Sequence, residues 1–213
     1  TLRKPNMLRP GTVGKVIADV EVKIAHDGEI LCKGPNVMLG YYREPEKTAE
    51  VLQDGWFSTG DIGEINEGFL RITDRKKELF KTSGGKYVAP QVLENAMKES
   101  IYIEQIMVVG DGQKFPAALI VPEFIALKQW AVGEGVAVDQ SMNWLKDVRV
   151  LKMIENEIST VNKRFGGWEQ VKAFRLLPRA FTIDATEITP TLKLKRKQIA
   201  ANWKVEIDSI YQA

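Results

Sequence analysis

The sequence predicts an α+β protein, in which a small antiparallel β subdomain is followed by an α/β domain with a short sheet flanked by helices. Two observations support this fold class. Apolar and polar residues alternate over parts of the first third of the chain, as in strands with one buried face. Farther along, apolar residues recur every three or four positions around short apolar runs, which indicates helices packed on strands.

The first third of the chain predicts a small antiparallel sheet. Residues 12–32 alternate between apolar and polar positions, and Asp27-Gly28 provides a hairpin turn within them. A short helix is expected over residues 45–52. Strands are expected over residues 56–65 and 69–73, because Asn66-Glu67-Gly68 between them is typical of a turn.

A domain boundary is predicted at Lys77. The segment Asp74-Arg75-Lys76-Lys77 interrupts the apolar pattern, and the charge balance changes at this point. Before Lys77 there are 11 basic and 12 acidic residues, whereas from Lys77 onward there are 19 basic and 16 acidic residues. We therefore expect one domain over residues 1–76 and a second over residues 77–213.

The second domain is predicted to contain a helix, a hairpin, a long helix, a strand and a final helix. Pro90 opens the first helix, and strands over residues 103–109 and 115–121 are joined at Asp111-Gly112. A strand is expected over residues 172–177. The long helix carries an apolar stripe of Val148, Leu151, Ile154, Ile158, Val161 and Phe165, and the final helix carries Ile199, Trp203, Ile207 and Ile210.

The composition is that of a folded globular chain. Of its 213 residues, 44% are hydrophobic and 27% are charged, so the chain can bury a core. The net charge of +2 is too small to direct the whole molecule to a nucleic acid, so we expect no nucleic-acid partner. The single cysteine, Cys32, cannot form an intramolecular disulfide, and no apolar run approaches the ~18 residues of a membrane span. We therefore expect a cytoplasmic protein without a transmembrane segment.

Two charged residues on either side of the predicted hairpin form the first candidate site. Asp61 follows an aromatic strand and Gly60, and a carboxylate at such a position can accept two hydroxyl hydrogen bonds, as in ribose recognition. Arg75 lies beyond the hairpin, which can fold it back beside Asp61. A turn-forming aspartate and a solvated surface charge are the alternatives that these residues leave open.

Two loops supply further candidates. Residues 81–86 (KTSGGK) contain glycines that permit backbone contact with a ligand, although their spacing is not that of a phosphate-binding P-loop. Residues 189–197 (TPTLKLKRK) place four cations within five positions, beginning at Lys193. A loop lysine can neutralise the charge that develops on a phosphate or carboxylate, and a solvated basic run is the alternative.

The histidine and cysteine content limits the other kinds of chemistry. His26 is the only histidine, so we expect no histidine-based triad and no metal site in this chain, and we place His26 in a surface turn. Cys32 lies in a predicted strand without a neighbouring base, which favours a buried structural thiol over a nucleophile.

Taken together and in order, these segments resemble the C-terminal portion of the AMP-forming acyl-CoA synthetases of the adenylate-forming superfamily. GPNVMLGYY at residues 34–42 and GWFSTGD at residues 55–61 are similar to the family's approach to its ribose-binding aspartate. ITDRKK at residues 72–77 is similar to its second ribose contact and interdomain hinge. FRLLP at residues 174–178 and TPTLKLKR at residues 189–196 resemble the long-chain fatty acid branch. The resemblance covers essentially the whole chain.

The resemblance implies a role for each candidate residue. Asp61 would bind the ribose hydroxyls of ATP and of the acyl-adenylate, and Arg75 would contact the same ribose and phosphate region. Lys77 would be the hinge between the large domain and a mobile C-terminal cap domain. Lys193 would bridge the carboxylate and the α-phosphate during adenylation, and Gly84 would line the pantetheine path during thioester formation.

The implied reaction joins a long-chain fatty acid to coenzyme A. The carboxylate and MgATP give acyl-AMP and pyrophosphate, and the CoA thiol then gives acyl-CoA and AMP. The family's phosphate loop, acyl pocket and Mg²⁺ ligand are expected upstream of Thr1, so we expect a fragment that is inactive alone. Acyl specificity, oligomeric state and peripheral membrane association of the whole enzyme stay open.

Two positions depart from the family pattern, and two other functions stay open. Lys77 stands where many relatives have Asp, and Leu192 stands where many have Gly, although the second difference fits the long-chain branch. One alternative is an adenylate-forming enzyme that delivers the acyl group to a carrier protein. The other is a non-catalytic module whose basic residues 193–197 bind a polyanion.

Overall fold

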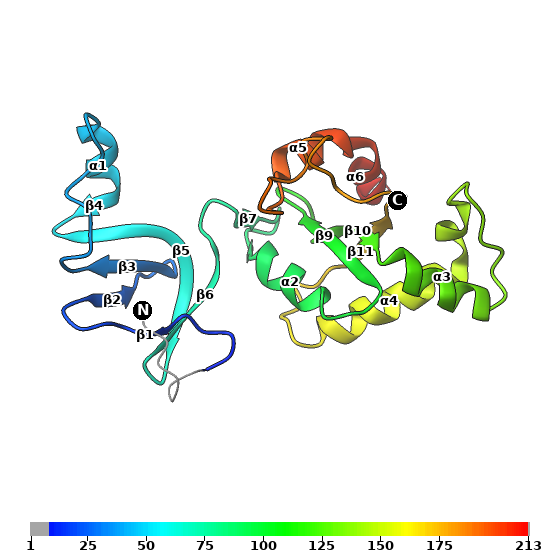
Figure 1. Cartoon of the computed structure of the whole chain (residues 1–213), viewed down its shortest axis with the longest axis horizontal. Helices are drawn as coiled ribbons and strands as arrows, with labels where there is room; N and C mark the ends of the chain where they lie inside the picture. The colour runs from blue at the N-terminus through cyan, green and yellow to red at the C-terminus, as the bar shows by residue number, and fades with distance from the viewer. Residues whose placement is uncertain (1–8, 213) are drawn as a thin grey trace. The chain divides into compact units, whose positions relative to one another are not determined.

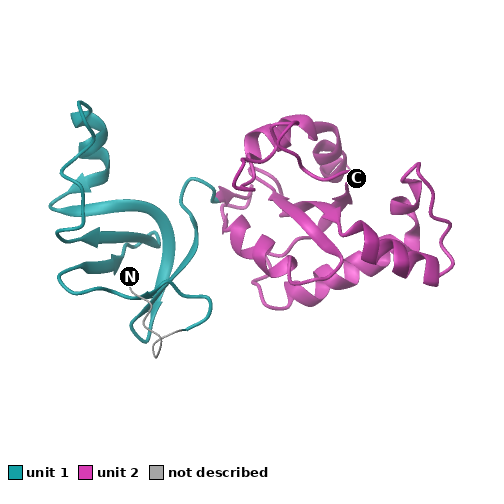
Figure 2. Cartoon of the chain, in the orientation of Figure 1, with its two compact units in different colours: residues 1–79 teal, residues 80–213 magenta. Residues whose placement is uncertain are grey.

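The computed structural model describes residues 9–212, and the chain divides into two compact units, residues 1–79 and residues 80–213 (Figure 2). The α+β class predicted from the sequence is confirmed. The division lies three residues beyond the predicted boundary before Lys77. Within the described residues, no helix combines the length and apolar character that crossing a membrane requires.

The first unit is an antiparallel sheet with one short helix (Figure 1). Its sheet order is β1-β6-β5-β3-β2, and β4 pairs with β5. Both predicted hairpins are present, since β2 pairs with β3 and β5 pairs with β6. The elements are β1 (Gly14–Lys15), β2 (Glu21–Ile24), β3 (Glu29–Lys33), α1 (Pro45–Val51), β4 (Leu52–Gln53), β5 (Trp56–Asn66) and β6 (Phe69–Arg75).

A bulge in the β5–β6 hairpin sets which residues face each other. Near the turn the ladder is regular, and Gly63 pairs with Ile72. The register then shifts by one residue, so that Asp61 pairs with Arg75. Without the bulge, the regular ladder would place Asp61 opposite Asp74. At the shift Gly63 must be glycine, because a Cβ there would lie 2.3 Å from the carbonyl oxygen of Arg71.

The second unit is a three-stranded sheet with helices on both faces and a small hairpin at its start (Figure 1). The sheet order is β11-β10-β9; β10 is antiparallel to β9 and parallel to β11. The elements are β7 (Phe80–Lys81), β8 (Tyr87–Val88), α2 (Pro90–Met97), β9 (Ile103–Val109), β10 (Ala117–Pro122), α3 (Phe124–Gly133), a 3₁₀ helix (Asn143–Lys146), α4 (Val148–Asn162), β11 (Ala173–Leu176), α5 (Arg196–Asn202) and α6 (Lys204–Tyr211).

The central strand β10 divides the core of this unit into two layers. Successive residues of a strand point to opposite faces, so Ala118 and Ile120 pack in the cluster that includes α2 and α4. Leu119 and Val121 pack in the cluster that includes α5 and α6. Figure 1 shows these two helix pairs on opposite sides of the sheet. The sheet is thus covered on both faces, as the sequence predicts.

The apolar stripe predicted for the long helix is wrong at its N-terminal end. Val148 is 76% exposed and Leu151 is 36% exposed, whereas Val150 is buried. Each residue of an α-helix turns by about 100°, so Val150 lies about 40° from Ile154 around the helix, whereas Val148 lies about 120° from Ile154 and Leu151 lies at the edge of the buried face. A spacing of three or four residues connects Ile154 to Leu151 and equally to Val150. Contact with the sheet determines that Val150 is the buried one.

Two further expectations are corrected by the structure. The predicted final helix is two helices, α5 and α6, because Trp203 between them has φ −112° and ψ 27°. The Trp203 indole N–H donates to the buried carboxylate of Glu187 at 2.9 Å, which stabilises this break. The thiol of Cys32 is half-buried rather than buried, and the Asn36 amide lies 3.9 Å from its sulfur.

Candidate active site

Asp61 and Arg75 form an ion pair across the β5–β6 ladder. They are register partners, and Arg75 Nε lies 2.9 Å from Asp61 Oδ1. The Asp61 side chain is 23% exposed and the Arg75 side chain 58% exposed, so both can be reached from solvent. A carboxylate that can accept hydroxyl hydrogen bonds therefore lies beside a guanidinium that can contact a phosphate.

The backbone before Asp61 is fixed by a network that the sequence does not reveal. Gly60 has φ +71°, and its N–H donates to Glu29 Oε1 at 2.9 Å. The Lys76 amide donates to the Gly60 carbonyl at 2.8 Å. Lys76 Nζ lies 2.7 Å from Asp27 Oδ2 and 2.7 Å from Glu29 Oε2, and these bonds raise the pKa of Lys76. The network thus ties three strands together next to Asp61.

Lys77, the predicted hinge residue, lies in a turn directly after this network. The Arg75 carbonyl accepts hydrogen bonds from the amides of Glu78 at 2.9 Å and Leu79 at 3.3 Å. Lys77 is exposed, and the division between the two compact units follows Leu79. The assignment of a hinge to Lys77 stays a prediction.

Lys193 lies on a tight loop that precedes α5. Its amide donates to Thr189 Oγ1 at 3.0 Å, and its carbonyl accepts from the Thr189 amide at 2.9 Å. Leu192 has φ +59°, a left-handed conformation that costs a residue with a Cβ roughly 1–2 kcal/mol. The loop therefore keeps a strained backbone at the position just before Lys193, whose side chain is exposed.

The residue at the base of this loop, Glu187, is a fully buried carboxylate. Arg179 donates to both of its oxygens, at 2.7 and 2.9 Å. The Trp203 indole and the Thr182 amide also donate to it, at 2.9 and 3.2 Å. Burial by itself raises the pKa of Glu187, but the hydrogen bonds, from Arg179 above all, outweigh it and lower the pKa to about 2. Glu187 is therefore ionised, and its backbone carbonyl accepts the Lys195 amide at 2.8 Å at the base of the Lys193 loop.

Gly84 lies in the loop between β7 and β8. The loop is closed by the Thr82 amide, which donates to the Lys86 carbonyl at 2.9 Å. Ser83 is bonded to the carbonyl of Gln113 at 2.9 Å. Gly84 is exposed, and a Cβ at this position would meet no atom closer than Thr82 Oγ1 at 4.0 Å. The loop thus has a defined backbone with open space above Gly84.

The structure joins some of the predicted site residues and leaves others apart. Asp61 and Arg75 touch in the first unit, whereas Lys193 and Gly84 lie on separate loops of the second. The sequence reasoning did not find the buried carboxylates Glu94 and Glu187. A signal existed for Glu94, because it falls on the same face of α2 as the buried Met97.

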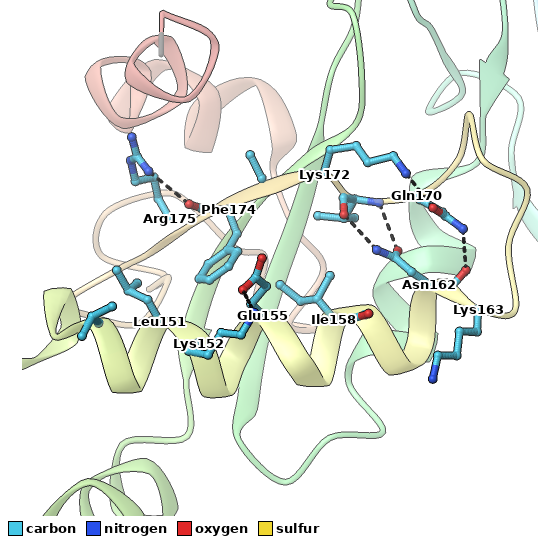
Figure 3. Close-up of a pocket in the computed structure, with 14 residues that line it drawn as sticks. Leu151, Lys152, Glu155, Ile158, Asn162, Lys163, Gln170, Lys172, Phe174 and Arg175 are labelled. Atoms are coloured by element: carbon cyan, nitrogen blue, oxygen red, sulfur yellow. Dashed lines mark hydrogen bonds and ion pairs between the residues drawn. The ribbon is translucent and has the colours of Figure 1, made fainter. Parts of the chain in front are cut away.

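Other features of the described residues lie outside this set. His26 is exposed in a turn, as predicted. Between residues 9 and 212 no group of three or more His, Cys, Asp or Glu side chains is arranged to hold a metal ion. A groove of about 660 Å³ runs between α4 and β11, with Leu151 and Phe174 among its walls (Figure 3). None of the predicted site residues lines this groove.

The comparison with protein families assigns the second unit. Residues 78–213 match the model of the AMP-binding enzyme C-terminal domain. The chain therefore belongs to the AMP-binding enzymes and carries the C-terminal domain of that family.

Curated relatives extend this similarity into the first unit. The chain is 41% identical over 208 residues to the long-chain-fatty-acid CoA ligase FadD15 of Mycobacterium tuberculosis, which covers 97% of this chain and 35% of that protein. It is 40% identical over 191 residues to human long-chain-fatty-acid CoA ligase 1, which covers 87% of this chain and 27% of that protein. The chain thus spans about a third or less of the length of these relatives.

Solved structures show the same fold. The adenylation domain of a carboxylate reductase from Mycobacterium chelonae aligns with a TM-score of 0.69 and 26% identity, over 87% of this chain and 28% of that one. O-succinylbenzoate coenzyme A synthetase from Bacillus subtilis, in complex with AMP, aligns with a TM-score of 0.61 and 26% identity, over 89% of this chain and 35% of that one.

Proposed function

We propose that this chain is part of an AMP-forming long-chain fatty acid CoA ligase. The complete enzyme converts a fatty acid and ATP to acyl-AMP and pyrophosphate, and then transfers the acyl group to CoA with release of AMP. The observation that carries the proposal is the similarity to long-chain-fatty-acid CoA ligases along nearly the whole chain. The ion pair of Asp61 with Arg75 supports it, because a carboxylate and a guanidinium together suit a nucleotide's ribose and phosphate.

Each site residue has a proposed role in this reaction. Asp61 binds the ribose hydroxyls of ATP, and Arg75 contacts the adjacent ribose and phosphate region. Lys193 offsets the repulsion between the carboxylate and the α-phosphate, which is the main electrostatic barrier to joining two anions. Lys77 is the hinge between the two arrangements of the enzyme, and Gly84 lines the path of the CoA thiol.

We propose that the complete enzyme uses ATP and CoA as co-substrates and Mg²⁺ as a cofactor. When bound, Mg²⁺ would neutralise charge on the phosphates of ATP. The described residues supply no cluster of ligands that fits the ion. We propose a cytoplasmic location for the enzyme.

The test is an assay of the complete enzyme with palmitate, ATP and CoA. We expect AMP release that requires palmitate and ATP and that is accelerated by free CoA. AMP release that is indifferent to CoA but requires a phosphopantetheinyl carrier protein would instead support the carrier-protein alternative. The polyanion-binding alternative predicts no AMP release and a steep salt dependence of heparin binding. It is weakened by Arg196, which is bound to Glu94 in the middle of the basic run.

Removal of the Asp61 carboxylate should weaken the use of ATP. Asp61→Ala leaves the ribose hydroxyls without their charged acceptor, and a hydrogen bond of this kind contributes about 1.5–3 kcal/mol, so the KM for ATP should rise about tenfold or more. The matched control is Glu64→Ala, which breaks the neighbouring ion pair of Glu64 with Arg71 on the same hairpin. An unchanged KM in Asp61→Ala would return Asp61 to the role of a turn residue.

A proline at position 77 should restrict the proposed hinge. Proline locks φ at position 77 and restricts the backbone of the preceding Lys76, so the turn closed by the Arg75 carbonyl cannot rearrange freely. At least one half-reaction of Lys77→Pro should slow, while Lys77→Ala, which leaves the backbone free, should keep both rates. If Lys77→Pro retains both half-reactions at the original rates, the hinge lies elsewhere.

A large side chain at position 84 should obstruct only the second half-reaction. Gly84→Leu fills the open space above the β7–β8 loop, so transfer of acyl-AMP to CoA should slow while acyl-AMP formation continues. Gly84→Ala is the control, because its Cβ meets no atom closer than 4.0 Å. Equal rates of CoA transfer in wild type and Gly84→Leu would show that Gly84 is only a linker.

A further inference from the structure

Arg196 and Glu94 form a two-pronged ion pair beside the Lys193 loop. Arg196 follows Lys193 by three residues and opens α5. Its two terminal nitrogens donate to the two oxygens of Glu94, at 2.8 and 2.6 Å. Glu94 is almost fully buried in α2. Paired charge-assisted bonds of this geometry fix both the distance and the orientation of the guanidinium.

The Glu94 carboxylate accepts a third hydrogen bond, from the backbone of β9. The amide of Val108 in β9 donates to Glu94 Oε1 at 2.7 Å. Burial raises the pKa of Glu94, while the hydrogen bonds from Arg196 act against this rise. One carboxylate therefore joins α2, β9 and the first residue of α5, all within the second unit.

The other end of the loop is equally fixed. The Lys195 amide donates to the Glu187 carbonyl at 2.8 Å, and Ile188 pairs with Leu194 as a short antiparallel bridge. The Glu187 side chain is buried and bound by Arg179. Lys193 thus lies on a short loop whose two sides are both held by buried carboxylates.

We infer that Glu94 and Arg196 are positioning residues for Lys193. The inference rests on the proposed function of Lys193 in acyl-AMP formation. A lysine side chain has many rotamers, so the place that its ammonium can reach depends on where the backbone holds its Cα. Misplacement of a reacting group by about 1 Å can cost about 10²-fold in rate. A rigid loop keeps the ammonium within reach of the two anions.

A purely stabilising role makes a different prediction. Removing one partner of a buried ion pair destabilises a fold, because the other charge stays buried without compensation. A role confined to stability would affect both half-reactions alike, through the amount of folded enzyme. A positioning role affects only the half-reaction that uses Lys193.

The test uses Arg196→Lys in the complete enzyme, because lysine keeps the charge but loses the two-pronged geometry. We expect acyl-AMP formation to slow about tenfold or more, with transfer of supplied acyl-AMP to CoA unchanged at temperatures where the variant is folded. Lys197→Met, a change in an exposed cation on the same segment, is the control and should leave both steps unchanged. Glu94→Gln, which keeps an acceptor for Val108, is the second variant and should repeat the selective loss.

A double-variant comparison separates this inference from the proposed function. If Arg196 acts through Lys193, adding Arg196→Lys to Lys193→Ala should cause no further loss of acyl-AMP formation. Equal slowing of both steps, additive losses, or unfolding of both Arg196→Lys and Glu94→Gln would overturn the positioning role. Failure of Lys193→Ala alone to slow acyl-AMP formation would instead overturn the proposed role of Lys193.

Discussion

Replacement of Lys193 by alanine should slow acyl-AMP formation by about 10²–10³-fold and spare the transfer of supplied acyl-AMP to CoA. A positioned cation that faces charge developing in the transition state commonly contributes this much. The loop around Lys193 is held by backbone and Thr189 hydrogen bonds that do not involve the Lys193 side chain, so the fold should survive the change. Measuring each half-reaction separately, with acyl-AMP supplied for the second, gives the two rates.

Lys195→Ala is the matched control for this experiment. Lys195 is exposed on the same loop, and its amide bond to Glu187 remains when the side chain is shortened. Both half-reactions should keep their rates in this variant. Equal losses in the two steps for Lys193→Ala would contradict the division of labour between the adenylating and thioester-forming arrangements.

The second large effect concerns the acid stability of the 213-residue chain. The pKa of Glu187 is about 2 in the folded protein, against 4.5 as its ordinary value. The folded state therefore favours the ionised form of Glu187. The contribution of Glu187 to the free energy of unfolding is complete above about pH 4.5 and is lost as the pH falls through about 2. The shift corresponds to about 3 kcal/mol of unfolding free energy.

Urea unfolding, followed by tryptophan fluorescence, tests this at several values between about pH 5.5 and about pH 2.5. Glu187→Gln should be less stable than wild type near pH 5.5, and the difference should shrink toward the acid end. Glu155→Gln, which removes an exposed carboxylate paired with Lys152, should follow the wild-type curve. Burial raises the pKa of Glu94, so its contribution to the free energy of unfolding changes with pH in the opposite direction. The effect of Glu187 is therefore read from the difference between wild type and variant at each pH. A constant difference between wild type and Glu187→Gln would refute the assignment.

The sequence predicts the strands better than the faces of the helices. The hairpin over β5 and β6 and the strand β9 follow from short periodic runs bounded by turn residues. The stripe of α4 is different, because two residue sets fit the helical period and only the position of the sheet selects Val150 over Val148. The break at Trp203 depends on Glu187, a partner that lies 16 residues earlier and is joined to it only in the folded chain.

The sequence likewise predicts one part of the candidate site and not the other. The approach of Asp61 to Arg75 could be predicted because a short hairpin brings residues on either side of its turn together. The supports of Lys193 could not, because Glu94 and Arg196 are 102 residues apart in sequence. A buried acidic residue is visible in a sequence only as a polar residue on an apolar face, and that pattern does not name its partner.

The bulge in the β5–β6 hairpin limits how this chain can change in length. Shortening β5 by one residue, at Ile62, while the extra residue Thr73 stays in β6, would bring Asp74 opposite Asp61. Two carboxylates would then face each other where an ion pair now lies, and like charges directly across a ladder are destabilising. Deletion of this residue of β5 should therefore be rare among relatives that retain the ion pair, whereas surface loops can tolerate single-residue deletions.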